Sequence, residues 1–206
     1  MTTLIDRLVG IDPGSPLDTS FAARAEARAQ AELSYHLLLH PVDAGAVSLL
    51  ERHAIAAFVA VLHDQPETRA HYRTLLERSD AGGIAAVVLR EVEAARSTGP
   101  YGRFPKGPLS VEDRAGLVYR VTPEVRAALG DRLSAALEQA HLLVLHPRDA
   151  SQAGLQSLLD AGWSTTGIVV LSQLVAFLSF QIRVVSGLRA VAAAAILNRA
   201  ATAIPA

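Results

Sequence analysis

The sequence predicts an all-α protein, on three observations. Half of its 206 residues are hydrophobic, chiefly Ala, Leu and Val, and only 5% are aromatic, which favours packed helices over a β-sandwich. Helix-start signals recur along the chain, whereas the best strand candidate, residues 118–121, is too short. A phrase centred on His-Pro also occurs twice, at His40-Pro41 and His146-Pro147, each time where an expected helix ends.

The two copies of the phrase lie 106 positions apart, about half the length of the chain. We interpret them as duplicated helix ends, because histidine near a helix C-terminus can bond the last carbonyls and proline cannot continue the helix. The repeat predicts one domain over residues 1–206. Its two related halves span about residues 19–96 and 122–200, joined by a connector over residues 97–121.

The elements of the first half follow from local signals. A long helix is expected over residues 19–39, since Ala, Glu, Arg and Leu favour helix and Pro41 lies just past its end. Ser48 and Glu51 have the spacing of a capping box and start the next helix. Pro66 suits the first position of another helix, which runs to about residue 79. Residues 84–96 are expected to be helical again.

The connector differs from the rest of the chain, because residues 99–108 contain three prolines and three glycines. Such a segment forms neither a continuous helix nor a central strand. Tyr101 and Phe104 favour docking on the protein. A connector packed across the bundle is the preferred interpretation, and an active-site lid is the alternative.

The second half is predicted to begin at Thr122-Pro123, a strong helix start, with a helix to about residue 145. A short helix follows, from Ser151 to about residue 160. An apolar helix then starts near residue 164 or 165, and Gly187 is expected to bend or end it before residues 190–199.

Composition also excludes several classes of protein. A net charge of −1 and the lack of a basic run give no reason to expect nucleic acid or a membrane surface as partner. The chain has no cysteine, which excludes disulfides, thiol catalysis and zinc–thiolate sites. Residues 167–182 carry no charge but are shorter than the roughly 20 residues that a membrane span needs, so a buried helix is expected. The N-terminus lacks a signal-peptide pattern, and we expect a cytoplasmic protein.

The chain resembles the carboxymuconolactone decarboxylase and alkylhydroperoxidase D-like superfamily. The residues that carry this likeness lie in the C-terminal third (155–164, 171–177 and 181–188) and in the first half (50–56 and 69–73). The resemblance implies a duplicated helical bundle of the alkylhydroperoxidase D-like type. It also implies a homo-oligomer, a trimer or a hexamer, which the large hydrophobic fraction favours as well.

Peroxidases of that superfamily carry a glutamate followed by Cys-x-x-Cys-x-x-x-His. Placing the histidine of the motif on His71 puts the cysteine positions on Glu67 and Asp64, and the glutamate falls beside Glu51. Anchoring on Glu51 instead puts the cysteine positions on His63 and Pro66. Both thiols are missing either way, so thiol peroxidase activity is not expected. The decarboxylase branch does not depend on the cysteine pair and stays open.

The residues that could replace this chemistry are Glu67, His71, Asp64 and Glu51. Glu67 and His71 share a helix face at i, i+4 and form a usable acid–base pair. The alternative is that these residues are structural. Asp64 and Glu67 suit a helix N-terminus, and His71 suits an exposed helix face. Glu51 belongs to the capping box with Ser48. A metal site that adds His53 and His63 is a third possibility. We predict no cofactor and no metal.

The sequence therefore leaves two main functions. The first is an enzyme that uses acid–base chemistry on a small organic acid or lactone. The second is a non-catalytic binding or assembly subunit that retains the fold. A peroxidase-related activity with a metal is a weaker third.

Overall fold

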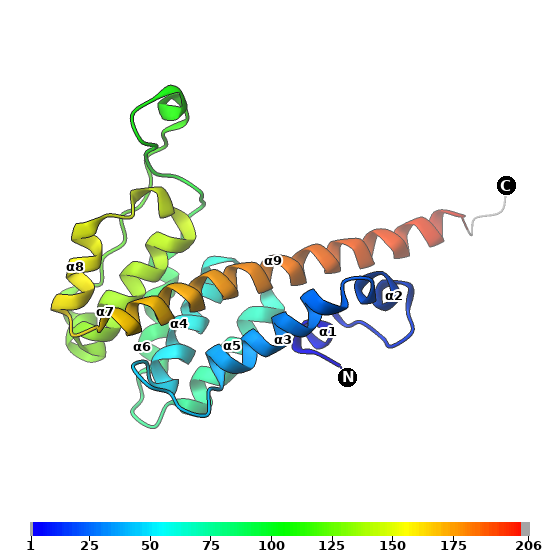
Figure 1. Cartoon of the computed structure of the whole chain (residues 1–206), viewed down its shortest axis with the longest axis horizontal. Coiled ribbons are helices and arrows are strands. Elements are labelled where there is room, and N and C mark those ends of the chain that lie inside the picture. Colours follow the sequence, from blue (N-terminus) through cyan, green and yellow to red (C-terminus); the bar gives the residue numbers. More distant parts are fainter. Residues whose placement is uncertain (1, 203–206) are drawn as a thin grey trace.

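A computed structural model describes residues 2–202, with the surroundings of side chains up to residue 195. The all-α prediction is confirmed, because these residues form helices and no strand (Figure 1). The α-helices of this part of the chain are α1 (Leu4–Val9), α2 (Pro16–Ala22), α3 (Ala25–Leu39), α4 (Leu49–Leu62), α5 (Pro66–Ser79), α6 (Ala85–Ala95), α7 (Pro123–Leu145), α8 (Gln152–Asp160) and α9 (Thr165–Thr202). Two short 3-10 helices, η1 (Pro108–Glu112) and η2 (Pro147–Asp149), lie between them.

Helix α4 is the centre of the bundle. It packs against α5 and α6 from its own half of the chain and against α7 and α9 from the other half. Every residue from Arg52 to Leu62 is buried, because neighbours cover the helix on all sides. Alanines alternate with larger residues along it, and the small side chains let the surrounding helices approach closely. The two predicted halves therefore share one hydrophobic core.

Arg52 closes the loop that follows the first His-Pro phrase. Its buried guanidinium donates to the backbone carbonyls of Val47 (2.9 Å), Leu38 (2.8 Å) and Ala44 (3.1 Å). Burial lowers the pKa of Arg52, but the three carbonyls replace the water that the cation has lost. A side chain on α4 thus fixes the backbone that leads into α4.

Arg132, on α7, joins three distant segments of the chain. It pairs with Glu51 at 2.5 Å and donates to the carbonyls of Ala46 and Gly162, both at 2.6 Å. Its guanidinium also lies 4.2 Å from the ring centroid of the buried Trp163, whose indole N–H donates to the Arg132 carbonyl. The expected capping box of Ser48 and Glu51 is present, and its carboxylate serves this ion pair as well. Glu51 is therefore a structural residue at the start of α4.

Both His-Pro phrases end a helix, as predicted. His40 has φ −136° and ψ 48°, and its N–H donates to the carbonyl of His36. His146 has φ −143° and ψ 55°, and its N–H donates to the carbonyl of Leu142. The two helix ends have nearly the same backbone conformation.

Three predicted helix boundaries were wrong. The helix expected over residues 19–39 is two helices, α2 and α3, separated at Ala23 and Arg24. Gly130, with φ +80°, interrupts the helix expected from residue 122 to 145 and kinks α7. Gly187 does not end the last helix, since α9 continues to Thr202.

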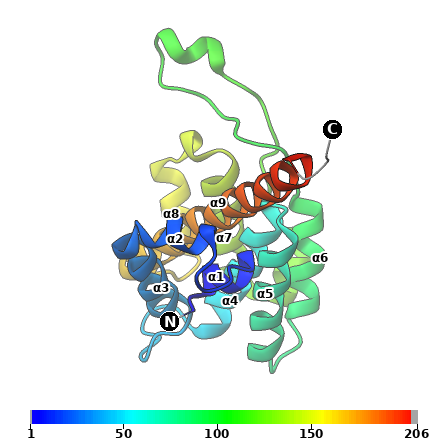
Figure 2. The same cartoon turned by 90° about the vertical axis from the view of Figure 1, so that its right-hand side faces the viewer.

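The connector docks on the bundle only at its root. Tyr101 is buried, its N–H donates to the carbonyl of Leu145, and its ring stacks on His146 at 5.1 Å. Phe104 lies under the guanidinium of Arg148 at 4.0 Å, so both aromatic residues dock as predicted. The part between residues 105 and 118 projects from the bundle and carries η1 at its tip (Figure 2), and the chain returns to the core at Tyr119, whose hydroxyl donates to Glu91. Gly102, with φ +112°, has no room for a side chain, because a Cβ would lie 2.9 Å from the Asp149 carboxylate.

Helix α9 is long and apolar enough to cross a membrane, judged by length and composition over Thr165–Ala195. Its Leu171, Leu174 and Leu178 are fully buried. The helix runs along the bundle and extends past it towards the C-terminus (Figure 1). The expected buried helix is thus found only in part, because one face of α9 packs in the core while Val169 and Phe180 are exposed. The helix that is enclosed on all sides is α4.

Replacing Glu51 by alanine should lower the free energy of unfolding by about 1–2 kcal/mol, because it removes the helix cap and the partly buried ion pair with Arg132. Urea-induced unfolding measures this change. Glu112→Ala, at an exposed position of the projecting connector, is the control and should leave the midpoint unchanged. Equal midpoints for both variants would contradict the structural role of Glu51.

Candidate functional site

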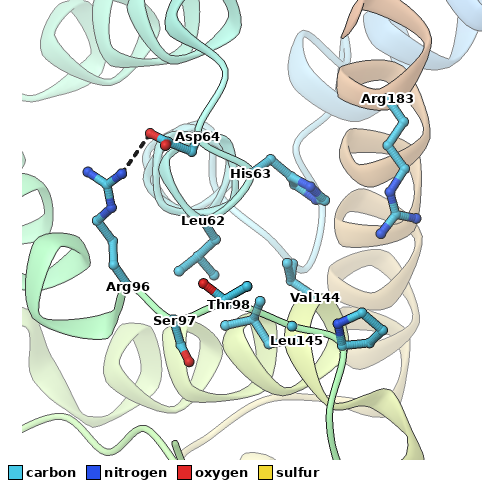
Figure 3. Close-up of a pocket in the computed structure, with 11 residues that line it drawn as sticks. Leu62, His63, Asp64, Arg96, Ser97, Thr98, Val144, Leu145 and Arg183 are labelled. Atoms are coloured by element: carbon cyan, nitrogen blue, oxygen red, sulfur yellow. Dashed lines mark ion pairs between the residues drawn. The ribbon is translucent and has the colours of Figure 1, made fainter. Parts of the chain in front are cut away.

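A cavity of about 440 Å³ opens where four parts of the chain meet (Figure 3). These parts are the C-terminal end of α4, the segment that follows α6, the end of α7 and the middle of α9. Its lining residues are Leu62, His63, Asp64, Arg96, Ser97, Thr98, Gly99, Pro100, Val144, Leu145 and Arg183. Two arginines, one histidine and two hydroxyl residues therefore face one hollow between the two halves.

The end of α4 places His63 and Asp64 at this cavity. The N–H of His63 donates to the carbonyl of Val59, and that of Asp64 donates to the carbonyl of Val61. Asp64 has φ +52°, a left-handed conformation that aspartate tolerates better than most residues. This turn reverses the chain between α4 and α5 and leaves both polar side chains at the mouth of the cavity (Figure 3).

The charge of Arg96 is already compensated. Its guanidinium lies 2.7 Å from the carboxylate of Asp64 and 3.1 Å from that of Glu93. Asp64 also lies 3.8 Å from Arg69. Arg96 and Asp64 thus form one exposed wall of the cavity, and neither is free to neutralise a ligand.

Arg183 is the second arginine that lines the cavity. It is exposed on α9, and no carboxylate of the described residues lies within 4.0 Å of it. Its side chain shares the cavity with His63 (Figure 3). Burial and then the charge of Arg183 lower the pKa of His63 to about 4, so this imidazole is neutral at pH 7. The pair offers a ligand one free positive charge beside one uncharged proton acceptor or donor.

Ser179 fixes the orientation of His63, since its hydroxyl lies 3.1 Å from Nε2 of the imidazole. A serine hydrogen-bonded to a histidine is also the arrangement of a catalytic nucleophile with its base. Two parts of such a site are missing among the described residues. No side chain orients the other nitrogen of His63, and Ser179 lies inside α9, where backbone N–H groups are committed to the helix. Ser179 is therefore a positioning residue.

The four acid–base residues predicted from the sequence do not come together. Asp64 lines the cavity. Glu67 instead pairs with Arg189 of α9 at 2.5 Å, and Glu51 pairs with Arg132. His71 bonds Tyr35, so the expected Glu67–His71 pair is not formed.

His71 belongs to a separate polar network of histidines and a tyrosine. The hydroxyl of Tyr35 lies 3.0 Å from Nε2 of His71 and 2.9 Å from Nε2 of His40. His53 lies 2.6 Å from the Ser79 hydroxyl and 2.8 Å from the carbonyl of Leu39. Burial raises the pKa of Tyr35 to about 12, so its hydroxyl keeps its proton and donates to one imidazole while it accepts from the other.

The same burial keeps these histidines neutral. It lowers the pKa of His71 to about 4 and also lowers those of His40 and His53. Among the residues with described surroundings, no three His, Asp or Glu side chains are placed to hold a metal ion, although several histidines lie close together. Tyr35 joins His40 and His71, and the network is part of the structure around α3, α4 and α5.

Sequence reasoning missed Arg183 and underrated His63. A signal for Arg183 was present, because it is the only charged residue between Trp163 and Arg189 in an otherwise apolar helix. A single charge in such a helix needs either a partner or a function. His63 carried no comparable signal, since nothing in the sequence places it beside α9.

The stability of the protein should fall as the pH is lowered from 6.5 to 4.5. His71 has a pKa of about 4 in the folded protein and near 6.5 when unfolded, so the unfolded chain binds the proton first. Each such histidine adds a slope of at most about 1.4 kcal/mol per pH unit. Urea unfolding across this range measures the slope, and His71→Gln should reduce it.

His36→Gln is the matched control, because the His36 side chain is 59% exposed, and it should leave the slope unchanged. A His71→Gln slope equal to that of the unaltered protein would show that His71 is not held neutral by the fold.

Comparisons with known proteins add no relative. No family model, no curated protein and no solved structure matches this chain.

Proposed function

We propose that this protein binds a small organic acid or lactone in the cavity between α4, α7 and α9, and that His63 exchanges a proton with the bound molecule. The observation that carries this proposal is the pairing of an uncompensated Arg183 with a neutral His63 in one cavity. Arg183 would hold a carboxylate or polarise a carbonyl, because a guanidinium binds both oxygens of a carboxylate in one plane.

Ligand binding would also change the chemistry of His63. Burial is the main cause of the low pKa of His63, and the positive charge of Arg183 adds to it. A carboxylate that pairs with Arg183 would offset the second cause and so raise the pKa of His63. A histidine with a pKa near the working pH transfers protons most effectively. Binding of the acid would thus make His63 a better proton donor or acceptor. The Ser179 hydroxyl would hold the imidazole in its orientation.

We further propose that the chain is a cysteine-free relative of the carboxymuconolactone decarboxylase and alkylhydroperoxidase D-like superfamily, with its duplicated bundle. The near-identical helix ends at His40 and His146 support duplication. A cytoplasmic homo-oligomer, a trimer or hexamer, is part of this proposal. Exposed apolar pairs at Leu33 and Leu37 on α3 and at Leu155 and Leu159 on α8 support an assembly.

A second candidate function is binding without catalysis. It is favoured by the absence, in the described part of the chain, of a group that orients the second nitrogen of His63. In this case the protein would bind the acid and release it unchanged. Turnover distinguishes the two functions, since only the catalytic one predicts that His63→Gln retains binding and abolishes product formation.

Arg183→Met should abolish the binding of small acids while leaving the fold intact. Isothermal titration calorimetry with acetate, butyrate and succinate measures the affinity, and a loss of at least about tenfold is expected from removal of a charge-assisted pair. Arg90→Met is the matched control, because Arg90 is an exposed arginine outside the cavity. Equal affinities in the two variants, or no binding of any acid by the unaltered protein, would contradict the proposal.

A further inference from the structure

A second hollow continues from the cavity along α7 and α9. It has a volume of about 700 Å³ and shares Pro100, Val144 and Arg183 with the first. Its remaining wall is largely apolar and includes Leu143, Val175, Ala176, Phe180 and Val184. The two hollows therefore adjoin at the three shared residues, and the first has the more polar lining and the second the more apolar one.

The apolar end offers a ligand almost no polar partner. Among the described residues that line it, the only charged one is Arg183, which also lines the first hollow. Its two serine hydroxyls are already used, because Ser172 donates to the carbonyl of Ile168 at 2.9 Å and Ser179 bonds His63 at 3.1 Å. A charged group placed here would lose part of its hydration and gain no polar partner in return, whereas an apolar group would gain from contact with this wall.

We infer that the ligand is a monocarboxylic acid with an apolar tail, its carboxylate on Arg183 and its tail along Val175, Ala176 and Phe180. This inference rests on the proposed function, because it uses the same Arg183. The single cation at the junction fixes the direction of the ligand. A dicarboxylate would place its second charge in the apolar hollow, so a monoacid fits better.

A chain-length series tests this inference. Calorimetry with acetate, butyrate, hexanoate and octanoate should show affinity rising about two- to fourfold per added methylene, as expected for partial to full burial of each group. Octylamine, with the same tail and the opposite charge, should not bind at Arg183. Ala176→Trp should fill the apolar hollow and weaken octanoate while leaving acetate unchanged.

Ala127→Trp is the matched control, because Ala127 is exposed on α7 outside both hollows. Affinity that does not change with chain length, or octanoate binding that Ala176→Trp leaves intact, would overturn the tail assignment. If short acids then still bind in an Arg183-dependent manner, the proposed function stands. If no acid binds, both fail.

Discussion

The enclosure of α4 on all sides is the constraint on which the rest of the structure depends. A helix that is covered around its whole circumference cannot expose a polar face, so its polar requirements are met at its two ends. At the N-terminal end, Ser48 and Glu51 cap the helix, while Arg52 and Arg132 bind the carbonyls of the surrounding loops. At the C-terminal end, the chain emerges at His63 and Asp64, and the cavity lies there. The site is located where the central helix leaves the core.

The titratable residues divide into two groups according to what they contact. His40 and His71 both bond the hydroxyl of Tyr35, and His53 bonds the carbonyl of Leu39. Glu51 and Glu67 pair with arginines from the second half of the chain. His63 and Arg183 are the pair that meets a cavity and keeps an unsatisfied charge. Ligand chemistry is therefore best supported at Arg183, a charge that no carboxylate of residues 2–195 accompanies within 4.0 Å.

Local features of the fold could be predicted from the sequence, and features that depend on tertiary contacts could not. Ser48, Pro66 and Thr122 start helices as expected, because caps and proline preferences act within one turn. The break between α2 and α3 escaped prediction because Ala23 and Arg24 both favour helix. The kink at Gly130 had a local signal, since a glycine inside a helical pattern can mark a break, and that signal was overlooked. The spacing of Glu67 and His71 correctly put both on α5. Their partners, Arg189 and Tyr35, come from distant parts of the chain, which spacing cannot reveal.

The covering of α4 by α7 and α9 has a consequence for synthesis of the protein. The ribosome releases α4 with α5 and α6 well before α7 and α9 exist, so one side of an almost wholly apolar helix faces solvent during that interval. The ion pair between Glu51 and Arg132, separated by 81 residues, also has to wait for the second half. The first half is thus an incomplete folding unit, which exposes apolar surface of α4 until α7 and α9 have been made.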